Sequence, residues 1–123
     1  EAEPLPEVSM WDGVFTADQA AEGRTIYAAN CASCHGATAR GGPGNPSLIG
    51  NTLNRKYADM PLSVFYDYMA MNMPAGRPGT LLPQQYADVL AFVLTAHGVE
   101  PGENTLTPDC ALLDSIIIGP RPE

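Results

Sequence analysis

The pentapeptide Cys31-Ala32-Ser33-Cys34-His35 decides how this sequence is interpreted. Its C-x-x-C-H pattern is the one by which c-type haem is attached to a chain. When the segment is wound as a helical turn, the two thiols match the separation of the haem vinyl groups, so that each sulfur can form a thioether. His35 follows directly and is thereby placed beneath the iron as its proximal ligand. The motif predicts one haem, covalently attached through Cys31 and Cys34.

Other uses of the two cysteines are possible. A Cys₃His zinc site would add Cys110 and His97 to the motif, but this requires two lone residues, distant in sequence, to converge on it. A thioredoxin-like redox pair would need βαβ elements, which the sequence does not predict. An inert cysteine pair would leave the adjacent His35 unexplained. We therefore expect haem, with zinc as the alternative.

The candidates for the second axial ligand are Met69, Met71, Met73 and His97. Met69 lies on the apolar face of a predicted helix, where core packing explains it, and Met71 falls on another face. Met73 has the strongest case because it stands where the helix ends and Pro74 stiffens the backbone after it. We interpret His97, at the end of the last predicted helix, as a capping cation or a surface group.

The apolar spacing predicts an all-α chain with helices over residues 16–30, 63–72 and 83–97. Thr16 and Gln19 fit a capping box at the start of the first helix. No period-2 run of any length is present apart from a short isoleucine segment near the C-terminus. The helices are expected to be joined by unusually long loops.

Glycine and proline, 12 residues of each, are concentrated in these loops. Residues 36–56 fit no regular element of any length, and a loop that long inside a small domain has to wrap something. The expected organisation is an N-terminal arm on the surface over 1–10, one domain over 11–118 and a tail over 119–123.

The charge balance limits the possible partners. Fourteen acidic and six basic residues give a net charge of −8, which excludes a nucleic-acid partner. The longest apolar stretch is about eight residues, far short of the roughly 20 that span a bilayer, so no membrane span is expected. The start at Glu1 fits a cleaved signal peptide, or a trimmed chain, and favours a periplasmic or otherwise extracytoplasmic location.

These features together resemble the class I c-type cytochromes. The likeness is carried by CASCH, by the loop Pro46–Gly50 (PSLIG), by Met73-Pro74 and by the closing helix YADVLAFVLTAHG. Over residues 10–118 the chain looks more narrowly like cytochrome domains found beside PQQ-dependent dehydrogenases. The resemblance implies the class I cytochrome c fold, in which the N- and C-terminal helices cross over the haem, with His35 and Met73 as the iron ligands.

The resemblance also assigns roles to further residues. Gly23 and Tyr27 match the small and aromatic contact positions of the first helix, and Phe92 matches the aromatic position of the last. In the proline-rich loop, Pro46 and Leu48 are expected to contact the haem.

Other expectations about the loop and the single side chains come from the residues alone. The carbonyl of Pro43 or Pro46 could accept a hydrogen bond from His35. We expect Cys110 to be a buried or partly buried free thiol, Trp11 to pack on the first helix and Arg77 to be solvated.

The sequence departs from the family's pattern at three places. Leu82 replaces the serine that usually caps the last helix, which leaves the start of that helix less well capped. Residues 99–102 follow the family's corner loosely, and Cys110 has no recognised counterpart.

An iron with His and Met on its two faces has no open position, which favours outer-sphere electron transfer over catalysis. We expect a monomeric monohaem cytochrome that carries single electrons from a dehydrogenase to a terminal oxidase or another cytochrome. A PQQ-dependent dehydrogenase is one possible donor. A haem-based sensor or gas-binding module, or the electron-exit subunit of a dehydrogenase complex, are the alternatives. Because Lys56 is the single lysine, docking should occur through an apolar or neutral patch.

Overall fold

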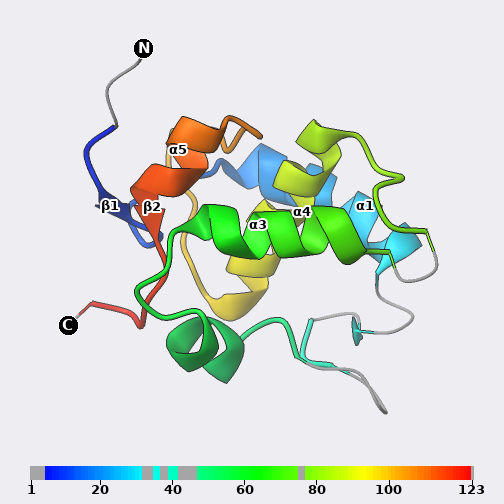
Figure 1. Ribbon diagram of the computed structural model, residues 1–123, viewed down its shortest axis with the longest axis horizontal. Helices are drawn as coiled ribbons and strands as arrows, with labels where there is room; N and C mark the ends of the chain where they lie inside the picture. The colour runs from blue at the N-terminus through cyan, green and yellow to red at the C-terminus, as the bar shows by residue number, and fades with distance from the viewer. Residues whose placement is uncertain (1–4, 32–34, 37–38, 42–46, 75–76, 123) are drawn as a thin grey trace.

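The computed structural model describes residues 5–31, 35–36, 39–41, 47–74 and 77–122. In chain order its elements are β1 (Val8–Ser9), α1 (Ala17–Asn30), the π-helix η1 (Thr52–Lys56), α3 (Leu62–Asn72), α4 (Pro83–His97), α5 (Cys110–Ser115) and β2 (Ile116–Ile117). The two strands are two residues long, so the helices dominate and the predicted all-α class is confirmed. Figure 1 shows α3 in front of α4 with α1 behind, and α4 contacts both of them.

Helix α1 begins as the sequence predicts, but only half of its capping box forms. The Thr16 hydroxyl accepts a hydrogen bond from the Gln19 amide at 3.0 Å. The Gln19 side chain does not complete the box; it is buried and binds the backbone of Leu106, accepting from its N–H at 2.9 Å and donating to its carbonyl at 2.7 Å. Gln19 thus ties the segment after α4 onto α1.

The crossing of α1 and α4 depends on a glycine. A Cβ atom placed on Gly23 would lie 1.7 Å from the carbonyl oxygen of Asp88, so no side chain fits between the helices there. One turn further along α1, the ring of Tyr27 packs against Phe92 with 4.9 Å between ring centroids. The small and aromatic contact positions expected for Gly23, Tyr27 and Phe92 are therefore present.

The ends of α4 are well defined. The Leu82 N–H donates to the Gln85 side chain at 2.7 Å, which compensates in part for the missing serine cap. Pro83, the first helical residue, has no N–H to satisfy. At the other end, Gly98 has φ 109°, the left-handed conformation that ends many helices and that glycine adopts without strain.

The chain termini contribute to the structure more than the sequence predicts. Val8 and Ser9 pair in parallel with Ile116 and Ile117, and the next residue, Met10, is fully buried. The expectation of a surface arm over 1–10 is therefore wrong at its C-terminal end. A two-residue pairing between segments more than a hundred residues apart leaves no periodic signal in either of them.

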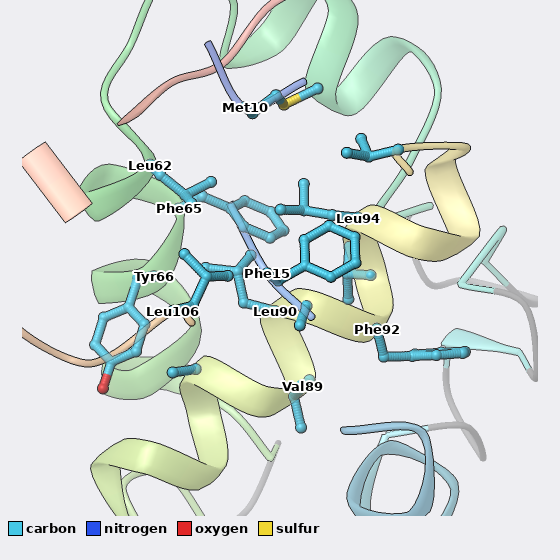
Figure 2. Close-up of a cluster of buried hydrophobic side chains, with 14 of the residues drawn as sticks. Met10, Phe15, Leu62, Phe65, Tyr66, Val89, Leu90, Phe92, Leu94 and Leu106 are labelled. Atoms are coloured by element: carbon cyan, nitrogen blue, oxygen red, sulfur yellow. The ribbon is translucent and has the colours of Figure 1, made fainter. Parts of the chain in front are cut away.

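The described apolar core lies between α3, α4 and the flanking segments. Figure 2 shows Phe15, Phe65, Leu90 and Leu94 converging at its centre, while Phe92 lies apart on α4. The segment after α4 also contributes to this core, because Leu106 is fully buried and the Gly102 N–H donates to the Phe15 carbonyl at 2.7 Å. The C-terminal segment is thus docked, although residues 99–102 only loosely match the family's corner.

Candidate functional site

Helix α1 ends directly before the C-x-x-C-H motif. Cys31 caps the helix, with its N–H bonded to the Tyr27 carbonyl at 2.8 Å, and the His35 N–H donates to the Cys31 carbonyl at 3.0 Å. Cys31 and His35 therefore lie one helical turn apart. Cys34 lies outside the described residues. The His35 residue is 5% exposed, which is unusual for histidine and consistent with an imidazole turned toward the interior.

The backbone after the motif is fixed by two further hydrogen bonds. The Tyr27 hydroxyl donates to the Gly36 carbonyl at 2.5 Å, and the Gly41 N–H donates to the His35 carbonyl at 2.8 Å. Burial, and to a smaller extent the proximity of Cys31, raises the pKa of Tyr27 to about 12. Tyr27 therefore keeps its proton and remains a donor at physiological pH.

The loop that follows is partly regular, contrary to expectation. Leu48 is half-buried against the core, and its N–H donates to the Ala39 carbonyl at 2.8 Å. Pro43 and Pro46, expected near the haem, lie outside the described residues, so their contacts with His35 or the haem stay predictions. Residues 52–56 form η1 rather than irregular loop. A single five-residue turn is too short to produce a detectable apolar period.

His97 is neither a capping cation nor a surface group, and this prediction is wrong. Its Nδ1 accepts a hydrogen bond from the Gly50 N–H at 2.9 Å, so the proton of the neutral ring is on Nε2, which lies 3.2 Å from the Asn54 side-chain oxygen. Burial, and then the nearby charge of Arg121, lowers the pKa of His97. His97 is therefore a neutral link between the end of α4 and the loop that follows the motif.

Trp11 packs on the C-terminal segment and on His97, whereas the sequence predicts contact with the first helix. Its ring centroid lies 5.6 Å from that of His97, and the Arg121 guanidinium lies 4.8 Å from the Trp11 ring centroid. The indole N–H donates to the Gly119 carbonyl at 2.9 Å. The expected tail is thus fixed on the domain by Trp11.

The structure separates the three methionine candidates clearly. Met69 is buried at 8% exposure, as core packing requires, whereas Met71 is 74% exposed and points to solvent. Met73 is half-buried against the core cluster. Its N–H donates to the Met69 carbonyl at 2.9 Å, and its carbonyl accepts from the Tyr86 hydroxyl at 2.6 Å. Met73 is the half-buried candidate at the end of α3, and a side chain of α4 holds its carbonyl.

The zinc alternative finds no support in the described part of the chain. No group of three or more His, Cys, Asp or Glu residues comes together there. Both ring nitrogens of His97 have partners, and Cys110 is a free thiol at the exposed start of α5. The expectation that Cys110 is buried is therefore wrong. Asp109 caps α5 by accepting from the Ala111 N–H at 3.3 Å, which leaves the neighbouring Cys110 facing outward. Arg77 is exposed, as expected.

The donor set fits haem rather than a bare metal ion. A thiol and an imidazole one turn apart can hold the ring and one face of its iron, and the thioether of Met73 suits the other face. The aromatic pair Tyr27–Phe92 and the half-buried Leu48 are apolar groups of the kind that surround a haem ring. The fold and this site define a class I c-type cytochrome.

Comparison with known proteins leads to the same class. The family model described as cytochrome C oxidase, cbb3-type, subunit III matches residues 18–93, and the chain belongs to this family of cytochrome c domains. It therefore carries covalently attached haem c, and cytochrome c domains of this kind function in electron transfer. No curated protein is significantly similar to it in sequence.

A solved structure shares the fold over almost the whole chain. The crystal structure of the sulfane dehydrogenase SoxCD from Paracoccus pantotrophus contains a chain that is 29% identical, with a TM-score of 0.64. The match covers 96% of this chain and 66% of that one, so the present chain spans slightly less than two thirds of its neighbour.

Among the described residues, no helix has both the length and the apolar character needed to cross a membrane.

Proposed function

We propose that this protein is an extracytoplasmic, periplasmic carrier that passes single electrons by outer-sphere transfer from a dehydrogenase to a downstream acceptor. Two observations support the proposal: His35, in the motif after α1, is buried, and Met73 has its backbone hydrogen-bonded to both α3 and α4. Class membership supports electron transfer in general terms. The direction of transfer, the ligand identities and the location are the proposed part.

In this proposal each residue has a defined role. Cys31 and Cys34 would tether the haem by thioether bonds, and His35 and Met73 would supply the two protein ligands of its iron. The haem, when bound, supplies one-electron iron chemistry. Two protein ligands leave no position open for oxygen or peroxide, and the same ligands in both oxidation states keep reorganisation small. If Phe92 and Leu48 lie against the ring, they would exclude water from it, and that would favour the reduced state of the iron.

The donor is proposed from the structural comparison. A neighbour that is a chain of a dehydrogenase structure favours a place for this chain as the electron-exit subunit of a dehydrogenase complex. The sequence resemblance to cytochrome domains beside PQQ-dependent dehydrogenases suggests a donor of a related kind. Purification of the native protein under mild conditions distinguishes a subunit of a dehydrogenase complex from a free electron carrier. Elution with a larger catalytic chain supports the subunit, and elution without one supports a free carrier.

Visible spectra test the proposed ligands. The oxidised protein should show a weak far-red band from methionine–iron charge transfer, and the reduced protein sharp c-type bands. Met73→Ala should abolish the far-red band, whereas the matched variants Met69→Ala and Met71→Ala should retain it. Retention of the band in Met73→Ala would assign the sixth ligand elsewhere, and absence of any Soret band would refute the haem site altogether.

Carbon monoxide separates the carrier from a sensor. If Met73 holds its position in the reduced protein, added carbon monoxide leaves the spectrum unchanged. A shifted Soret band at low gas concentration would instead favour a gas-binding module in which the methionine is displaced.

A further inference from the structure

Helices α3 and α4 are joined by a reciprocal pair of tyrosines. Tyr86 of α4 donates its hydroxyl to the carbonyl of Met73, the residue that caps α3, at 2.6 Å. Tyr66 of α3 donates its hydroxyl to the carbonyl of Pro83, the first residue of α4, at 3.0 Å. The two rings pack edge to face with 6.4 Å between centroids. We call Tyr66 and Tyr86 the tyrosine pair.

Both members of the pair are buried, so their hydroxyls have little water to bind in place of the backbone. Tyr86 is 3% exposed and Tyr66 is 7% exposed. Figure 2 shows the Tyr66 hydroxyl pointing away from the apolar core. Burial, followed by the charges of Asp67, Tyr86 and Cys110, raises the pKa of Tyr66, which therefore stays a donor. A phenol donor buried against a carbonyl is stabilising chiefly because the acceptor would otherwise be left unpaired.

The two hydrogen bonds differ in what they hold. The bond from Tyr66 fixes the start of α4 and has no contact with a proposed ligand. The bond from Tyr86 fixes the carbonyl of Met73. The N–H of Met73 is bonded to the last turn of α3, and its backbone is extended, with φ −122° and ψ 152°. Both backbone groups of Met73 are therefore hydrogen-bonded, the N–H to α3 and the carbonyl to α4, which restricts movement of the residue that bears the thioether.

We infer that Tyr86 is a positioning residue for the sixth ligand: its hydroxyl holds Met73 over the iron and resists exchange of the methionine for another ligand. This inference rests on the proposed function, in which Met73 is that ligand. Tyr66 contributes to the same helix contact without acting on the ligand, which makes it a control within the same structure.

Competition with imidazole tests the inference on the complete haem-loaded protein. Imidazole is titrated into the oxidised parent, Tyr86→Phe and Tyr66→Phe, and the loss of the far-red band gives the apparent affinity. Loss of one buried neutral hydrogen bond should favour exchange by about three- to tenfold. We expect that increase in imidazole affinity for Tyr86→Phe, and a change of less than about twofold for Tyr66→Phe. Chemical denaturation of both variants should show similar losses of global stability, since each loses one buried hydroxyl.

The possible outcomes separate the inference from the proposal beneath it. If both variants bind imidazole equally, or if Tyr66→Phe binds it more tightly, Tyr86 has no special role and the inference is overturned while Met73 remains the ligand. If the parent lacks the far-red band, or if Met73→Ala keeps it, the ligand assignment itself is wrong and the role of Tyr86 is excluded with it. Stronger imidazole binding in Tyr86→Phe alone supports the inference.

Discussion

Replacement of Gly23 by alanine should separate α1 from α4. A Cβ at this position would lie 1.7 Å from the Asp88 carbonyl oxygen and 2.4 Å from the Asp88 carbonyl carbon, whereas an ordinary van der Waals contact is 3.4–4 Å. Both atoms belong to the backbone of α4, so the contact cannot be relieved by a change of rotamer. The helices have to move apart, which loosens the packing between the Tyr27 and Phe92 rings.

The expected cost follows from two opposing effects. Forced overpacking in a rigid helix contact typically costs about 1–3 kcal/mol and sometimes more, and an overlap this deep against backbone belongs at the upper end. Alanine gains about 1 kcal/mol over glycine in helix propensity. The net expectation is a loss of about 2–3 kcal/mol in the free energy of unfolding. Urea denaturation of the haem-loaded protein, followed by circular dichroism, should show a midpoint lower by about 1–2 M.

Gly119→Ala is the matched control, because a Cβ at Gly119 meets nothing within 4 Å and the residue has no positive φ. We expect its stability to stay within about 0.5 kcal/mol of the parent. If Gly23→Ala were as stable as the parent, the close approach of α1 and α4 at Asp88 would be wrong, since helix propensity alone cannot offset an overlap of this kind.

Two further predictions concern pH and salt. His97 has a lowered pKa in the folded protein, so the unfolded chain takes up a proton first as the pH falls. The free energy of unfolding should therefore decrease as the pH drops through the ordinary histidine pKa of 6.5. Denaturation between pH 5 and about 8 should show this decrease in the parent and a smaller one in His97→Gln, whose side chain cannot titrate. The protein has a single lysine, Lys56, and cannot form a basic docking ring. The rate of electron transfer to its partner, measured by stopped flow, should therefore depend weakly on ionic strength. A steep fall in this rate as the salt concentration rises would instead indicate charge steering.

Local signals were sufficient for the three long helices α1, α3 and α4, but not for the short elements η1 and α5. Thr16 at the N-cap, Pro83 at the first turn and Gly98 after the last turn each act on backbone groups within a few residues, so the sequence around them contains the whole interaction. The motif Cys31–His35 is local in the same sense, because its first and last residues are one helical turn apart. Met73 could be proposed from its position at a helix end, next to Pro74.

The residues that sequence reasoning misread act at long range. His97 has the residue type and the position of a helix-capping cation, and only the N–H of Gly50, brought to its Nδ1 by the fold, shows that the ring is neutral. Gln19 fits a capping box in every local respect, yet its amide binds Leu106, 87 residues away in sequence. In both cases a tertiary partner competes with the local one and prevails. For Gln19 the reason is that the fully buried backbone of Leu106 has no water to bind.

These long-range contacts share a physical cause in the composition. A chain rich in glycine and proline forms loops that have few apolar side chains and many backbone groups in need of partners. Their partners here are the hydroxyl groups of tyrosines that otherwise pack in the apolar core. The Tyr27 hydroxyl donates to the Gly36 carbonyl, and the Tyr86 hydroxyl donates to the Met73 carbonyl. Periodicity assigns such tyrosines to the core and cannot show which loop they hold. Because each hydroxyl acts on one loop, its removal should release that loop before it unfolds the helices. Measurements on the ligand are therefore expected to detect the loss of the Tyr86 hydroxyl more sensitively than measurements of global stability.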